Sequence, residues 1–177
     1  HAGEPVASEA SVHAAGAWLA RLHATGYADE DPMDAGEALA RRRDAWLCRA
    51  RADLDCSKIA DFDFEAFAGV RRGVCHRDFT PSNWRWDSER GLTVIDFGQS
   101  RPDVALWDLV KLEAELFRQQ PSLRTPFYAG YGALGSDDAA RLAGLLLLHG
   151  LQTAVWGDQH GDAAFSALGR AILSRET

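Results

Sequence analysis

The sequence lacks any apolar run long enough to cross a membrane. Its longest apolar block runs from Leu142 to Leu148 and contains one glycine, whereas a membrane-spanning helix needs about 20 consecutive apolar residues. No segment has the pattern of a signal peptide. We therefore predict that the protein has no membrane partner and that it is cytoplasmic.

Positive charge is also scarce. The 19 Lys and Arg residues face 26 Asp and Glu residues, which gives a net charge of −7, and lysine occurs only at Lys58 and Lys111. Without a basic stripe there is little to bind a phosphate backbone, so nucleic acid is excluded as a partner. The acidic balance is compatible with a cationic small substrate, and equally with a role in solubility alone.

Cysteine occurs three times, at Cys48, Cys56 and Cys75. An odd number of cysteines without metal-type spacing argues against a disulfide framework and indicates a reducing, intracellular compartment. Cys75 falls in a predicted buried strand, where we interpret it as a small apolar residue rather than a nucleophile. The length of 177 residues, with 46% hydrophobic and 25% charged residues, is typical of one globular domain.

The most informative stretch of the sequence runs from Val74 to Ser100. The predicted elements are, in order, a strand ending at 74–75, a polar loop over 76–83, and two β-prone runs at 83–86 and 92–95. Gly91, in the connection between the two runs, can adopt the positive φ that such a turn needs. We expect the resulting hairpin to bring Asp96 back beside Asn83, at the loop that carries Asp78.

Two carboxylates and an amide in one place suit phosphoryl transfer. Asn83 and Asp96 offer hard oxygen ligands for Mg²⁺, and Asp78 can accept the proton of an attacking alcohol. Residues 76–83 match the pattern H-R-D-x-x-x-x-N, and residues 96–98 match D-F-G, a pair of motifs that kinases share. The alternative is a polar loop followed by a chance Asp-Phe-Gly turn.

These motifs resemble the catalytic loop and metal-binding aspartate of the aminoglycoside phosphotransferase and choline kinase superfamily, which has a protein-kinase-like fold. Only a few residues separate Gly98 from the amphipathic segment that opens at Ala105, so the long activation segment of protein kinases is missing. Further segments that resemble the superfamily are 19–23, Asp108-Leu109 and 127–132. The resemblance covers most of the chain, while the specific motifs lie at 76–98.

The resemblance implies an ATP-dependent kinase that phosphorylates an alcohol group of a small molecule, with Mg²⁺ as cofactor. Asp78 would be the base, His76 would maintain the shape of the loop through hydrogen bonds, and Arg77 would anchor local charge. Asn83 and Asp96 would bind the metal and nucleotide, and Ser82 is a weaker candidate for a phosphate contact. The acceptor would be an aminoglycoside, another cationic amino alcohol or an unidentified metabolite, as in antibiotic-resistance kinases.

A complete kinase of this fold also needs a mostly β lobe with a glycine-rich cover and a lysine that grips the nucleotide phosphates. No strand-rich stretch precedes the first predicted helix, and neither Lys58 nor Lys111 lies in a suitable strand pattern. We therefore expect a mainly α (α+β) fold: the helical C-terminal lobe over 10–177, with its small central hairpin and the catalytic loop at 74–100. Residues 1–9 would be a linker or a cut end, and the N-terminal lobe would be absent from this chain.

The rest of the chain is predicted to be helical, with helices over about 12–22, 34–54, 104–119, 136–156 and 163–174. Asp108, in the first turns of the third helix, can accept N–H bonds from the catalytic loop or can simply favour the helix N-terminus. His23 is interpreted as a packed or capping histidine rather than a ligand. Asp158 and Asp162 could meet a substrate ammonium, or could be solvated loop residues.

Two other classes of function stay open from the residues alone. One is a non-catalytic binding or scaffold domain that retains the kinase lobe, which the missing second lobe favours and the intact trio of Asp78, Asn83 and Asp96 disfavours. The other is a metal-dependent phosphohydrolase with His76, Asp78 and Asp96 as ligands, although such sites usually need more ligands than this loop offers.

Overall fold

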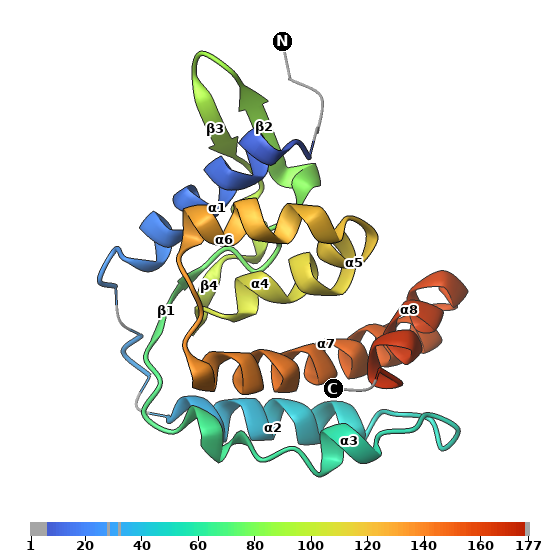
Figure 1. Ribbon diagram of the computed structural model, residues 1–177. Coiled ribbons are helices and arrows are strands. Elements are labelled where there is room, and N and C mark those ends of the chain that lie inside the picture. The colour runs from blue at the N-terminus through green and yellow to red at the C-terminus, as the bar shows by residue number, and fades with distance from the viewer. Residues whose placement is uncertain (1–6, 28, 32, 176–177) are drawn as a thin grey trace. The chain divides into compact units, whose positions relative to one another are not determined.

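The computed structural model describes residues 7–27, 29–31 and 33–175. The chain forms two compact units, one from His1–Glu30 and Arg71–Gly135 and the other from Asp31–Val70 and Ser136–Thr177. Figure 1 shows that helices dominate and that the strands form two small two-stranded sheets. This confirms the predicted fold class, a mainly α protein with a small β-hairpin. No helix within the described ranges combines the length and the apolar character that a membrane crossing requires.

In the first unit, helix α1 (Glu9–His23) packs against helix α6 (Arg124–Tyr131). Ser8 caps α1 through the reciprocal hydrogen bonds of a capping box. Residues 1–6 of the predicted linker lie outside the described residues. The two helices come very close at Gly16, where a Cβ atom would lie 2.2 Å from the carbonyl oxygen of Phe127.

The predicted hairpin is confirmed. Strand β2 (Trp84–Asp87) pairs antiparallel with strand β3 (Gly91–Val94). The carboxylate of Asp87 accepts hydrogen bonds from the N–H groups of Glu89 and Arg90, and Gly91 has a φ of 82°. Local turn chemistry therefore sets the register of this hairpin.

A second sheet joins strand β1 (Arg72–Cys75) with strand β4 (Arg101–Val104), again antiparallel. The predicted end of a strand at Val74-Cys75 is confirmed, but β4 was not predicted. The sequence analysis placed Val104 at the start of a helix, and that boundary is wrong, because Val104 pairs with Arg72. A four-residue strand that contains Pro102 has too weak a local signal to be recognised without its partner.

The helical segment after β4 begins at Trp107 and changes type along its length. It consists of α4 (Trp107–Lys111), a π-helical turn η4 (Leu112–Leu116) and α5 (Phe117–Gln119), followed by a 3-10 turn η5 (Pro121–Leu123). Its apolar side chains are buried, Leu109, Leu112 and Phe117 among them. This segment therefore contributes to the core of the first unit.

The second unit contains α2 (Ala35–Leu47), α3 (Ser57–Ala60), the 3-10 helix η1 (Phe64–Phe67), α7 (Ser136–His160) and α8 (Ala163–Leu173). Asp34 caps α2 as predicted, by accepting a hydrogen bond from the N–H of Gly36. The predicted end of this helix near Leu54 is wrong, because from Arg49 onward the N–H groups bond three residues back and the chain turns. α7 in turn continues past the predicted end at Trp156.

The joint between α7 and α8 uses both acidic residues that were considered for a substrate ammonium. Asp162 caps α8 by accepting from the N–H of Phe165, at 2.9 Å. Asp158 accepts from the hydroxyl of Ser166 at 2.5 Å and pairs with Arg170 at 3.0 Å. Neither of the two predicted alternatives describes them, since both carboxylates hold the helix pair together.

Candidate active site

The start of the catalytic loop is held by one buried carboxylate, that of Asp108 on α4. Its Oδ2 accepts a hydrogen bond from the N–H of His76 at 2.8 Å, and its Oδ1 accepts from the N–H of Arg77 at 2.5 Å. The side chain of Asp108 is fully buried. Of the two predicted alternatives for Asp108, the contact with the catalytic loop is therefore confirmed.

Asp108 is itself held by His23 at the end of α1. His23 Nε2 lies 3.0 Å from Asp108 Oδ2, and His23 Nδ1 lies 2.9 Å from the hydroxyl of Tyr131 on α6. The ring nitrogens can serve both partners if Nε2–H donates to the carboxylate and Nδ1 accepts from the tyrosine. His23 is thus a packed structural residue, as interpreted from the sequence, and it links α1 and α6 to the loop.

The side chain of Arg77 is largely buried. It forms an ion pair with the buried Asp103, and its guanidinium lies 4.9 Å from the centre of the Trp107 ring. Its charge is therefore committed to the scaffold of the loop. The role of Arg77 in anchoring local charge stays a prediction.

Asp78 is partly exposed, and each of its carboxylate oxygens has a partner. Oδ1 lies 2.5 Å from the ammonium of Lys111, and Oδ2 accepts from the amide of Asn83 at 3.0 Å. Partial burial by itself raises the pKa of Asp78, but the hydrogen bonds and the charge of Lys111, together with the bond from Asn83, outweigh it and lower the pKa overall. The carboxylate is ionised and oriented.

Asn83 is buried, and its amide has a defined orientation. Its Nδ2 donates both to the main-chain oxygen of Asp78 at 2.8 Å and to the Asp78 carboxylate. Both donor bonds therefore point toward Asp78, which leaves Oδ1 of Asn83 as the atom available to a cation.

Asp96 comes back to Asn83 through the hairpin. The N–H of Ile95 donates to the main-chain oxygen of Asn83 at 3.0 Å, so Asp96 follows directly on a residue bonded to Asn83. The Asp96 side chain is exposed, and its Oδ1 accepts only a long bond, of 3.3 Å, from the N–H of Gly98. An amide oxygen and a carboxylate are hard oxygen donors, so this pair fits Mg²⁺.

Backbone strain is concentrated in the same two motifs. Within the described part of the chain, Arg77 (φ 65°) and Asp96 (φ 63°) are the non-glycine residues with positive φ. Such conformations are sparsely populated and cost on the order of 1–3 kcal/mol each, so they persist where surrounding contacts impose them, often at functional sites. The strain therefore points to the same loops as the motifs.

The two remaining predicted site residues occupy different surroundings. His76 is fully buried, its Nε2 donates to the main-chain oxygen of Ile95 at 3.0 Å, and its Nδ1 accepts from the N–H of Asp78. With both ring nitrogens engaged, His76 has no atom for a metal, which removes the basis for a phosphohydrolase site. Ser82 is exposed, and its hydroxyl lies 2.8 Å from that of Thr80.

Sequence reasoning missed Lys111 as a member of this site. It was considered only as the lysine of a missing β lobe and set aside because it lies in a helix. The signal that could have found it is its spacing, since Lys111 follows Asp108 by three residues and so lies on the same helical face. Without the fold, however, nothing in the sequence shows that this face meets the catalytic loop.

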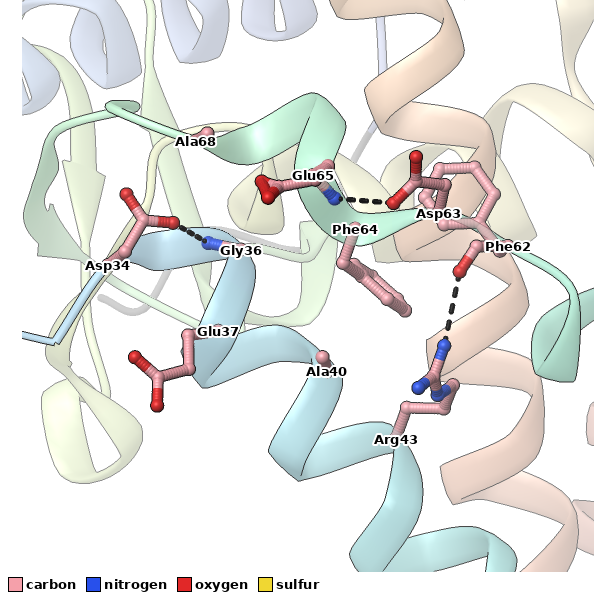
Figure 2. A pocket seen from close by; sticks show the side chains of 10 residues that line it. All are labelled: Asp34, Gly36, Glu37, Ala40, Arg43, Phe62, Asp63, Phe64, Glu65 and Ala68. Carbon is pink, nitrogen blue, oxygen red and sulfur yellow. Dashed lines mark hydrogen bonds between the residues drawn. The ribbon is translucent and has the colours of Figure 1, made fainter.

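The second unit carries a groove of about 440 Å³ between α2 and the segment around η1 (Figure 2). Four carboxylates line it: Asp34, Glu37, Asp63 and Glu65. Asp34 accepts from the N–H groups of Gly36 and Gly69, and Asp63 accepts from the N–H of Glu65. These two acids therefore cap local turns, as the dashed lines in Figure 2 illustrate for Asp34 and Asp63.

The helical fold and the loop motifs define the class of kinase-like phosphotransferases. The chain belongs to the phosphotransferase enzyme family, which matches residues 2–145. This confirms the resemblance found in the motifs. No curated protein matches the sequence.

Solved structures of similar fold include a type I macrolide 2'-phosphotransferase, with a TM-score of 0.64 and 19% identity over 96% of this chain and 60% of that one. The choline kinase LicA from Streptococcus pneumoniae has a TM-score of 0.71 and 15% identity, over 98% of this chain and 65% of that one. The GDP complex of aminoglycoside 2'-phosphotransferase-IIIa has a TM-score of 0.63 and 14% identity, over 94% and 62%. The chain thus spans 60–65% of the length of these three proteins.

Proposed function

We propose that this chain is the catalytic lobe of an ATP-dependent kinase that phosphorylates an alcohol group of a small molecule. The observation that carries the proposal is the Asp78 carboxylate, which is ionised, partly exposed and oriented by Asn83, while the main-chain oxygen of Asn83 accepts from Ile95, the residue before Asp96. The family of the chain and the phosphotransferases among the structures of similar fold support the same class of reaction.

When bound, Mg²⁺ and ATP supply charge neutralisation and the phosphoryl group. The oxygen of the acceptor hydroxyl would bond to the terminal phosphorus, and the bond from that phosphorus to the leaving ADP oxygen would break. Asp78 would accept the hydroxyl proton on a carboxylate oxygen. Asn83 and Asp96 would hold the metal ion through their side-chain oxygens. Asp108 keeps the backbone at His76 and Arg77 in the conformation that presents Asp78.

For the acceptor, we propose a cationic amino alcohol or an aminoglycoside. The net charge of −7 is compatible with such a substrate. Among the structures of similar fold, one is named a choline kinase and another an aminoglycoside phosphotransferase. The reaction would take place in the cytoplasm, in keeping with the three cysteines, which are all free.

A second candidate is a binding or scaffold domain without turnover. Measurement of ADP release by the purified full-length protein with Mg²⁺, ATP and the panel of acceptors separates the two, because such a domain would show no turnover.

The test of the proposed function is the variant Asp78→Asn, assayed in the full-length protein with Mg²⁺ and ATP against a panel of amino sugars and amino alcohols. Loss of the base is expected to lower kcat by about 10²- to 10⁴-fold. Asp61→Asn, at an exposed carboxylate of the second unit, is the matched control and should leave kcat unchanged. Turnover by Asp78→Asn equal to that of the control would refute the assignment of the base.

A further inference from the structure

Lys111 is the cation that directly contacts the candidate base. Its Nζ lies 2.5 Å from Asp78 Oδ1, and the side chains of Lys111 and Asp78 are 34% and 29% exposed, respectively. The pair is therefore open to a ligand on one side. Asp78 takes up one of the three N–H donors of the ammonium, and the long aliphatic stem lets the group move.

The helix around Lys111 is built to reach the catalytic loop at two points. Asp108 on α4 binds the backbone of the loop, and three residues later Lys111 binds the side chain of Asp78. The π-helical turn η4 starts at the next residue, Leu112. π-helical turns are rare overall, but those that occur are often found at functional sites. They change which side chains share a face of the helix.

Two carboxylates interact with the Lys111 ammonium, those of Asp78 and Glu115. Burial raises the pKa of Glu115, and the positive charge of Lys111 acts against that rise. Arg77, a cation of the catalytic loop, is paired with Asp103. An ion pair as exposed as Lys111–Asp78 contributes little to stability, so a ligand can engage the Lys111 ammonium at little cost to the fold.

A transferred phosphoryl group carries negative charge and must come close to the Asp78 carboxylate, which is also negative. These like charges repel each other, and the repulsion grows as water is excluded from the site. A cation placed between them offsets it. Arg and Lys clamps on transferring phosphoryl groups act in this way.

We propose that Lys111 binds the terminal phosphoryl group of the nucleotide, with its ammonium shared between that group and Asp78. The inference rests on the proposed function. It gives Lys111 two tasks: it orients Asp78 before the nucleotide arrives, and it neutralises charge on the transferred group afterwards.

The test compares nucleotides that differ only in the terminal phosphate. Binding of AMP-PNP and of ADP, each with Mg²⁺, is measured by calorimetry on the full-length protein, with the guanine analogues in parallel. For Lys111→Met, the Kd for AMP-PNP should rise about 10- to 100-fold, the range expected for a lost charge-assisted hydrogen bond, while the Kd for ADP changes less than about two-fold. Lys111→Arg keeps the charge and should retain most of the preference for the triphosphate.

The control is Lys58→Met, because Lys58 is the other lysine of the sequence and its ammonium donates to the main-chain oxygen of Arg175 in the second unit. It should leave both Kd values unchanged. A Lys111→Met variant that loses ADP and AMP-PNP affinity equally, or loses neither, would overturn the proposal. A wild-type protein that binds none of the nucleotides would refute the proposed function together with this inference, and so differs from a failure of Lys111 alone.

Discussion

The contact between Asp108 and the catalytic loop can be tested by replacing the carboxylate with an amide of the same shape, in Asp108→Asn. The wild-type carboxylate accepts from two main-chain N–H groups, those of His76 and Arg77, and lies against His23. An asparagine has one oxygen and one NH₂ group at this place. Whichever way the amide is turned, at least one N–H donor of the loop then faces another N–H donor.

The magnitude follows from the number of bonds lost. One hydrogen bond to a charged group contributes about 1.5–3 kcal/mol, and leaving a buried donor unsatisfied costs about 1–3 kcal/mol. Both figures describe in part the same lost bond, so they do not add in full. We expect the free energy of unfolding to fall by about 2–4 kcal/mol. At about 2–4 °C per kcal/mol for a chain of this size, the unfolding midpoint should fall by at least about 4 °C.

Urea and thermal unfolding, followed by circular dichroism, measure this change in the full-length protein. Asp61→Asn serves as the control, since its carboxylate is exposed, and it should stay within about 0.5 kcal/mol of wild type. If Asp108→Asn unfolds at the same midpoint as this control, the loop does not depend on the Asp108 contacts, and the account of how Asp78 is presented is wrong.

Two further predictions concern packing and pH. Gly16→Ala should lower the free energy of unfolding by about 1–3 kcal/mol, because the added Cβ would meet the backbone of α6 at Phe127. The control is Glu9→Ala, at an exposed position of the same helix. An unfolding midpoint equal to that of the control would contradict the close helix contact. Burial raises the pKa of Glu115 above its ordinary value, so the folded state holds this proton more tightly than the unfolded state and the group costs stability as the pH rises above that value. Glu115→Gln should therefore gain stability relative to wild type between pH 4 and pH 7, and urea titrations in which the difference stays constant or reverses over this range would refute the shift.

Several features of this protein could be read from neighbouring residues in the sequence. The hairpin follows from the β-prone runs around Gly91 and from Asp87 in the turn, which are local signals. The cap of α2 follows from Asp34 in the same way. The position of Asp96 beside Asn83 follows from the hairpin register, because a period of two residues leaves little freedom in how the strands pair. Interactions between residues close together in the sequence set these features, so they can be predicted from the sequence.

Other features depend on partners far away along the chain. β4 is extended because β1 lies beside it, and no residue in 101–104 predicts the pairing with β1. His23 and Lys111 belong to the site because α1 and α4 converge on the catalytic loop. The number of residues between such partners reveals nothing about their distance in space.

The sequence by itself determined where the proposed chemistry lies: the candidate base, the candidate oxygen ligands and the turn that joins them fall within one short stretch. Only the tertiary structure decided what supports that stretch, namely the carboxylate that holds the loop and the lysine that contacts the candidate base. The physical reason is that side-chain type and short-range backbone preference are local properties, whereas the placement of a charge beside another depends on how distant helices pack.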